Sequence, residues 1–175
     1  MTRVAILGNA GGGKSTLARK LAVAQQLPYH AIDRLQWLPG WRLAQRAQFN
    51  RNHDAILAGE RWIVDGVGDL DAVARQLARA DTVVFVDLPL RTHLWWATRR
   101  QIRSIFVGRT DGPEGCPMWR VTWRHYRMIW WIHRELQPQL QALIAATMPA
   151  AQVFHLRSPR EIAAFERQYC RAMPA

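Results

Sequence analysis

Residues 8–16 read GNAGGGKST and lie between an apolar run, RVAIL (3–7), and a helical pattern, LARKLA (17–22). Gly8, Gly13, Lys14 and Ser15 match the phosphate-loop pattern G-x-x-x-x-G-K-[ST]. In such a loop, glycines let backbone N–H groups curl around a phosphate, the lysine reaches the β and γ oxygens, and the hydroxyl completes a magnesium shell. The stretch therefore predicts a strand, a loop and a helix that bind ATP with Mg²⁺. The residues expected to contact the nucleotide are Gly8, Asn9, Ala10, Gly11, Gly12, Gly13, Lys14, Ser15 and Thr16.

A dinucleotide-binding turn is the alternative interpretation of the same glycines. Gly8, Ala10 and Gly13 fit a loose G-x-G-x-x-G/A, and Asp33 follows at about the distance of a ribose-binding acid. Lys14 is one of only two lysines in the chain and stands at the position that the phosphate loop requires. The lysine favours ATP binding over an oxidoreductase.

The length of the chain indicates a single domain, residues 1–175, large enough to bury a core of its own. Cys116 and Cys170 lie far apart, which predicts neither a zinc site nor a disulfide and agrees with a cytoplasmic location. No apolar run approaches the ~18 residues of a membrane span. The net charge of +11 comes almost entirely from arginine, a residue suited to phosphates. Three explanations of this charge remain open: binding of nucleic acid, a lid that clamps polyphosphates, or an arginine-rich genome.

Apolar and helical patterns alternate along the chain. Together they predict a doubly wound α/β fold, a five-stranded parallel sheet flanked by helices, with ligands at the carboxyl ends of the strands. Gly8, Asp33, Asp65, Asp87 and Arg157 all fall at such ends. The predicted strands are 2–7, 28–33, 61–66, 81–89 and 152–156. The predicted helices are 14–26, 44–58, about 70–77, 90–105, 118–135 with Pro138 breaking or restarting it, and one after the capping box at 158–161.

Several of these segments together resemble small P-loop kinases of the adenylate kinase type, and more closely bacterial proteins labelled topology modulation or adenylate-kinase-related. The segments are GNAGGGKSTLARKLA (8–22), IDRLQWLPGW (32–41), RWIVDG (61–66), ADTVVFVDLP (80–89) and GRTDGPEGCP (108–117). The resemblance implies a P-loop NTPase core with a magnesium-bound ATP site. It also implies an arginine-bearing lid over about 99–120, an acceptor site beneath it, and a loop at Arg157 against the adenine.

The acceptor side departs from that resemblance. IVDGVGDL (63–70) is similar to the kinase signature D-G-F-P-R, but Asp69 stands where the arginine would hold a monophosphate. An acid there predicts repulsion of a phosphate acceptor, unless Arg34, Arg42 or Arg46 substitutes. Asp33, at the end of the second strand, is then expected to accept a proton from a hydroxyl acceptor. The alternative for Asp33 is a cap of the next turn.

The remaining candidate site residues are a metal carboxylate and a group of lid arginines. Asp65, with Ser15, is expected to orient magnesium through water, and Asp87 is the second choice. The arginines are expected to stabilise the transferred phosphate, although a solvated basic face would carry the same residues. They are Arg99, Arg103 and Arg109, with Arg100 beside them.

Aromatic and basic residues recur at helical spacing after residue 118. We expect them to form core packing or part of a dimer face, whereas stacking on nucleic acid is the less favoured interpretation. They are Trp119, Trp123, Tyr126 and Trp130, with Arg120, Arg124 and Arg127. The sequence therefore predicts a phosphotransferase acting on a small acceptor, with a hydroxyl preferred. A nucleotide-dependent regulatory or nucleic-acid-binding P-loop ATPase is the alternative.

Overall fold

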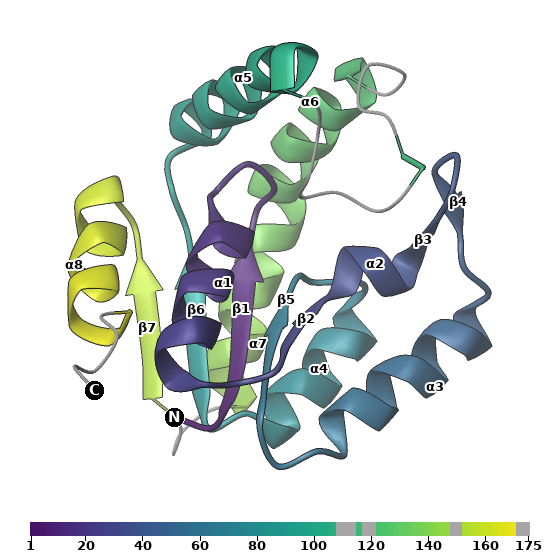
Figure 1. Cartoon of the computed structure of the whole chain (residues 1–175), viewed down its shortest axis with the longest axis vertical. Helices are drawn as coiled ribbons and strands as arrows, with labels where there is room; N and C mark the ends of the chain where they lie inside the picture. The colour runs from purple at the N-terminus through teal and green to yellow at the C-terminus, as the bar shows by residue number, and fades with distance from the viewer. Residues whose placement is uncertain (108–114, 117–121, 148–151, 171–175) are drawn as a thin grey trace.

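The computed structural model describes residues 1–107, 115–116, 122–147 and 152–170 (Figure 1). Its first half contains β1 (Arg3–Gly8), α1 (Lys14–Gln25), β2 (Tyr29–Ala31), α2 (Ile32–Gln36), β3 (Trp37–Leu38), β4 (Arg42–Leu43), α3 (Arg46–Leu57) and β5 (Trp62–Asp65). Its second half contains α4 (Leu70–Arg79), β6 (Thr82–Val86), α5 (Leu90–Val107), α6 (Thr122–Trp131), a π-helix (Ile132–Leu136), α7 (Gln137–Thr147), β7 (Gln152–Leu156) and α8 (Pro159–Tyr169).

Five parallel strands form the main sheet in the order β2-β5-β1-β6-β7. The predicted parallel α/β fold is confirmed. β1 lies at the centre, with Val4 opposite Ile63 of β5 and Thr82 of β6. From β1 the chain first builds the sheet on one side, with β2 and β5, and then on the other, with β6 and β7. The loop after β1 therefore lies at the topological switch point, where ligands of such sheets bind.

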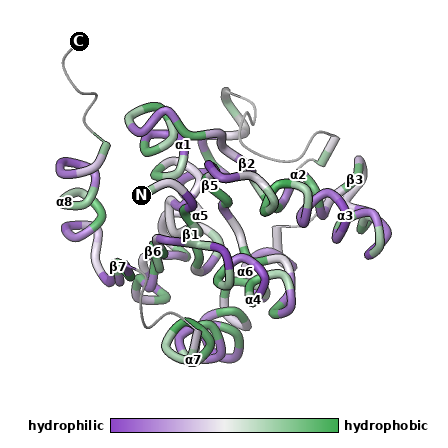
Figure 2. The backbone as a smooth tube through the Cα atoms, turned by 90° about the horizontal axis from the view of Figure 1, so that it is seen from below, coloured by the Kyte–Doolittle hydropathy of each residue, from purple (hydrophilic) through white to green (hydrophobic). Residues whose placement is uncertain are grey.

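Alternate side chains of each strand enter two separate cores. Ala5 and Leu7 of β1 pack with α3, α4 and α7, whereas Val4 and Ile6 pack with α1 and α8. Figure 2 shows α1 and α7 on opposite sides of the strands. Both faces of the sheet are therefore covered, which explains the uninterrupted apolar strands of the sequence. In the described part of the chain, no helix is both long and apolar enough to cross a membrane.

The segment after β2 differs from the prediction. β2 ends at Ala31, and Asp33 lies in the first turn of α2 instead of at a strand end. The chain then forms a small antiparallel hairpin of β3 and β4, whose turn contains Gly40 at φ 77° and Trp41 at φ 60°. The strands of two residues are too short to leave an alternating pattern in the sequence.

Pro138 restarts the helix, as expected, by way of a widened turn. The Gln137 N–H donates to Ile132 O, five residues back, at the end of the π-helix. Pro138 has no N–H to donate, so the helical ladder lacks one donor directly after this widened turn.

Asp69 has a local structural role. It is the N-cap of α4, where its Oδ1 accepts a hydrogen bond from the Ala72 N–H at 2.8 Å. Its other oxygen lies 3.2 Å from Arg46 Nη2. Asp69 thus has partners in the helix end and in Arg46, and its repulsion of an acceptor phosphate stays a prediction.

Replacing Asp69 with alanine should lower the free energy of unfolding by about 1 kcal/mol, since the first turn of α4 loses its capping acceptor. Denaturant titration measures this change. Asp69→Asn is the matched control, because asparagine caps as well as aspartate but carries no charge. Equal losses in both variants would assign the effect to the Arg46 ion pair instead of the cap.

Candidate active site

The loop between β1 and α1 passes unusually close to the neighbouring strand. Gly8 has φ 132°, and a Cβ at this position would overlap the carbonyl oxygen of Val86 on β6. Gly13 has φ 79° and is the N-cap of α1. Both positions are strained for any residue with a side chain, so the glycines set the path of the loop. The positive end of α1 then faces the space above the strands.

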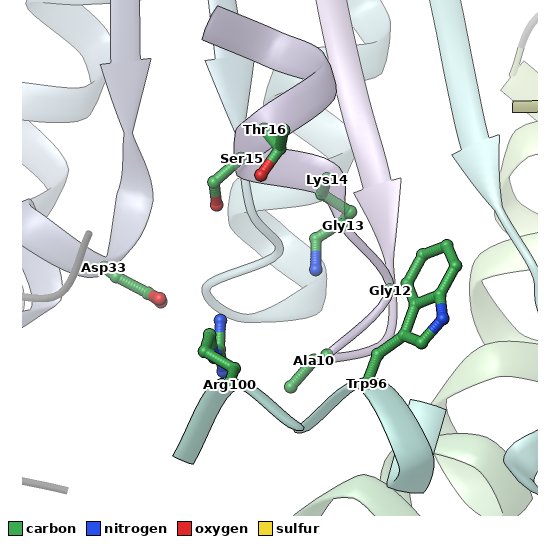
Figure 3. Close-up of a pocket in the computed structure, with 10 residues that line it drawn as sticks. Ala10, Gly12, Gly13, Lys14, Ser15, Thr16, Asp33, Trp96 and Arg100 are labelled. Atoms are coloured by element: carbon green, nitrogen blue, oxygen red, sulfur yellow. The ribbon is translucent and has the colours of Figure 1, made fainter. Parts of the chain in front are cut away.

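One pocket lies at this end of the sheet (Figure 3). Its described lining residues are Ala10, Gly11, Gly12, Gly13, Lys14, Ser15, Thr16, Asp33, Trp96 and Arg100. They come from three places in the sequence: the loop with the start of α1, helix α2, and helix α5. Figure 3 shows the side chains of Lys14, Ser15, Asp33 and Arg100 pointing into the same hollow.

Lys14 is held inside the loop. Its Nζ donates a hydrogen bond to the carbonyl oxygen of Asn9 at 2.8 Å. Burial lowers the pKa of Lys14, and the carboxylates of Asp65 and Asp33 act in the opposite direction. The partly buried ammonium of Lys14 therefore has one direct hydrogen bond and two nearby carboxylates that balance its charge.

Asp65 ends β5 beneath Lys14 and is almost completely buried. Burial raises the pKa of its carboxyl group, whereas Lys14 and the hydroxyl groups of Ser15 and Tyr29 oppose that shift. The Tyr29 hydroxyl donates to Asp65 Oδ2 at 3.1 Å, and the pKa of Tyr29 is raised to about 12, by burial first and by Asp65 second. Asp65 Oδ1 has no hydrogen bond of normal geometry from any described residue. A buried carboxylate oxygen in this state, beside a serine hydroxyl, fits the oxygen ligands and ordered waters of a magnesium ion.

The lid arginines separate according to the side of α5 on which they lie. Arg100 lines the pocket opposite Asp33, together with Trp96 one turn earlier. Arg99 and Arg103 are exposed and are not among the lining residues. Arg109 lies outside the described residues. Sequence reasoning favoured Arg99 and Arg103, but the buried face that His93 and Ala97 form on α5 continues to Arg100 at helical spacing.

Asp87 and Arg157 are engaged elsewhere. Asp87 accepts hydrogen bonds from the side chain of Gln137, from Gln141 at 2.8 Å, and lies 2.7 Å from His155 Nε2. The Arg157 side chain contacts His155, and its main-chain N–H donates to Glu161 at 2.7 Å. Neither residue lines the described pocket.

His93, which sequence reasoning did not single out, and Asn9, which it expected to contact the nucleotide, connect the loop to helices α5 and α6. His93 Nδ1 bonds to the carbonyl oxygen of Ala10 at 3.1 Å, and a Cβ on Gly12 would come within 2.8 Å of the imidazole. Asn9 is fully buried, and its Nδ2 donates to Ile129 O on α6 at 2.8 Å. Burial, with the charge of Lys14, lowers the pKa of His93 to about 4, so the ring is neutral at pH 7 and donates from Nδ1.

The arrangement of strands and loop is shared with known structures. This is the fold of small P-loop kinases. A shikimate kinase from Acinetobacter baumannii in complex with shikimate matches with a TM-score of 0.60 and 12% identity, over 96% of this chain and 90% of that one. A shikimate kinase from Aquifex aeolicus matches with a TM-score of 0.53 and 15% identity, over 95% and 94%.

An unliganded sugar kinase from Janibacter also matches, with a TM-score of 0.52 and 15% identity, over 99% of this chain and 97% of that one. No family model and no curated protein sequence matches the chain. At these identities the likeness establishes the fold, and the function has to be argued from the pocket of this chain.

The depressed pKa of His93 predicts a stability that depends on pH. The unfolded imidazole binds a proton near pH 6.5, whereas the folded one does so only near pH 4, so stability is lost as pH falls through this interval. His93→Gln keeps a donor for Ala10 O but does not titrate. Its free energy of unfolding should vary less steeply between pH 6.5 and 4, by up to about 1.4 kcal/mol per pH unit. Denaturant titrations at several pH values would contradict this assignment if the two slopes were equal.

Proposed function

We propose that this protein is an ATP-dependent phosphotransferase that transfers the γ-phosphate to a hydroxyl group of a small acceptor. The observation that carries the proposal is the shared pocket. A phosphate loop with its lysine forms one side of it, and the Asp33 carboxylate faces the loop from α2 on the other. A protein that only bound a nucleotide would have no need for a carboxylate opposite the terminal phosphate.

The donor side of the proposal uses the loop itself. Backbone N–H groups of residues 10–15 and the Lys14 ammonium would bind the β- and γ-phosphates. Ser15 and Asp65 are the residues that would hold Mg²⁺, Asp65 through water. The ion would neutralise charge on the phosphate oxygens. Trp96 packs against the core on the α1 and α8 side, at the end of the pocket away from Asp33, and we assign it to the side of the nucleoside.

The acceptor side uses Asp33. As the acceptor oxygen forms its bond to the γ-phosphorus and the bond to the β-phosphate oxygen breaks, the hydroxyl proton passes to the Asp33 carboxylate. Asp33 is exposed and in reach of an incoming molecule. The hydroxyl preference rests mainly on Asp33, because Asp69 also serves as the cap of α4. The neighbouring structures are named for shikimate and for a sugar, and both are hydroxyl-bearing small molecules.

The sequence resemblance refines the proposal to the adenylate-kinase-related group labelled topology modulation. A cytoplasmic location, where ATP is made and thiols stay reduced, agrees with the free Cys116 and Cys170.

Asp33→Asn tests the proposal most directly. A screen of hydroxyl-bearing metabolites, nucleosides and nucleoside monophosphates with labelled ATP first identifies the acceptor. The asparagine keeps the shape but cannot take the proton, so transfer to a hydroxyl should fall by about 10²- to 10⁴-fold while ATP affinity stays the same. Lys14→Ala is the companion variant, in which transfer should be abolished. Efficient transfer to a monophosphate that Asp33→Asn leaves untouched would refute the hydroxyl proposal, and unchanged turnover in Lys14→Ala would refute phosphotransfer at this loop.

Arg100 and Arg99 differ by one position and offer a matched pair. Arg100 lines the pocket opposite Asp33, so Arg100→Gln should lower kcat by about 10-fold or more through loss of a charge facing the transferred phosphate. Arg99→Gln removes the same charge from the exposed side of α5. Steady-state kinetics with both variants shows which of the two arginines contributes to kcat. A larger loss in Arg99→Gln would favour a lid movement that brings the outer arginines over the nucleotide.

A further inference from the structure

Helix α5 exposes a continuous stripe of alternating basic and aromatic or apolar side chains. Trp95 is 64% exposed and Phe106 is 82% exposed. The stripe consists of Arg91, Trp95, Arg99, Ile102, Arg103 and Phe106, which recur at helical spacing and are all exposed. This spacing places them on one face of the helix. The opposite face holds the buried His93 and Ala97 beneath the phosphate loop.

Helix α6 continues the same pattern toward the π-helix. Trp123 is 74% exposed, and Trp130, two turns later, is 52% exposed. Arg127 lies between them, and Arg134 follows with its guanidinium 5.7 Å from the centre of the Trp130 ring. Trp123 and Trp130 are therefore not packed in the core of the chain, the expectation of a dimer face stays a prediction, and Trp119 lies outside the described residues. Ile129, on the inner side of α6, is the buried residue.

The two stripes belong to adjacent helices. The Thr98 hydroxyl and the Tyr126 hydroxyl are 2.7 Å apart, which joins α5 to α6 on the flank of each helix between its buried and exposed sides. Figure 1 shows both helices above the carboxyl ends of the strands. We call the exposed side chains of the two stripes the arginine-aromatic face. None of its residues is among those that line the described pocket.

The charge of this face is of one sign. Helix α5 contributes Arg91, Arg99 and Arg103 to it and helix α6 contributes Arg127, and neither helix contains an Asp or Glu. A second copy of the chain would bring guanidinium groups against guanidinium groups, which costs free energy when both are desolvated. A membrane surface calls for a continuous apolar side, but here arginine interrupts the apolar side chains at nearly every turn.

We infer that the arginine-aromatic face binds single-stranded nucleic acid. Such a strand supplies a phosphate for each arginine and a flat base for each intervening ring, and base–aromatic stacking contributes independently of sequence. The face lies outside the pocket, so this inference does not depend on the proposed phosphotransferase activity.

Fluorescence anisotropy of a labelled 20-nucleotide oligo(dT) and a matched oligo(U) across a KCl series tests the inference. Binding should be independent of sequence and should weaken steeply with salt. Arg127→Gln should reduce the slope of log K against log salt by about 0.7, the value for one phosphate contact on a single strand. Arg51→Gln is the charge-matched control, because Arg51 is exposed on α3, away from this face, and its variant should leave the slope unchanged.

Trp123→Leu should weaken binding by about 5- to 100-fold, whereas Trp123→Phe keeps a ring and should recover most of the affinity. Far-UV circular dichroism of each variant checks the fold, which an exposed side chain should leave intact. Four results would overturn the inference. They are no binding to either oligonucleotide, equal effects of Arg127→Gln and Arg51→Gln, stronger binding to phosphatidylserine vesicles than to oligonucleotides, and a concentration-dependent dimer that Trp123→Leu abolishes.

Discussion

The structure depends on a partly buried cation held in a loop that only glycine can follow. Gly8 brings the chain against Val86 of β6, and Gly13 turns it into α1, so that Lys14 lies inside the loop. Burying an ammonium costs free energy unless acceptors surround it, and here Asn9 O, Asp65 and Asp33 provide that environment. The carboxylate of Asp65 is stabilised in turn, because the charge of Lys14 opposes the rise in its pKa that burial causes. Lys14, after β1, and Asp65, at the end of β5, therefore stabilise each other's charge, and the rest of the fold has to keep the two groups close together.

Helices α5 and α6 provide that support from outside the sheet. His93 bonds to Ala10 O, and Asn9 bonds to Ile129 O, so each helix holds the loop through one neutral hydrogen bond. A neutral His93 matters here, because an imidazolium next to Lys14 would place two cations in one buried space. The widened turn before Pro138 continues α6 into α7, whose Gln137 and Gln141 bind Asp87. The loop is thereby linked to the end of β6 through one long helical segment.

The sequence predicted the loop and the sheet well because both leave strong local patterns: fixed glycines and a lysine in one case, and uninterrupted apolar runs in the other. It could not predict where side chains point when that depends on tertiary contacts. Asp69 reads as a substitute in an acceptor signature, but the start of α4 uses it as a cap. The β3–β4 hairpin is too short for a periodic signal. For Trp123 and Trp130, large apolar side chains at helical spacing favoured core packing, since spacing alone does not reveal which face of a helix meets a partner.

Adjacent residues on α5 show why this choice of face matters for function. Successive residues of an α-helix point about 100° apart, so Trp96 and Arg100 can line the pocket while Trp95 and Arg99 face a different, exposed side. One helix therefore presents an arginine and a tryptophan to each of two surfaces. A ligand on the arginine-aromatic face would contact the same helix that positions Arg100 and holds Ala10 through His93. Any shift of α5 along its axis or about it would move both surfaces together, because the helix is continuous from Leu90 to Val107. Coupling between the two surfaces would then follow from the rigidity of a single element.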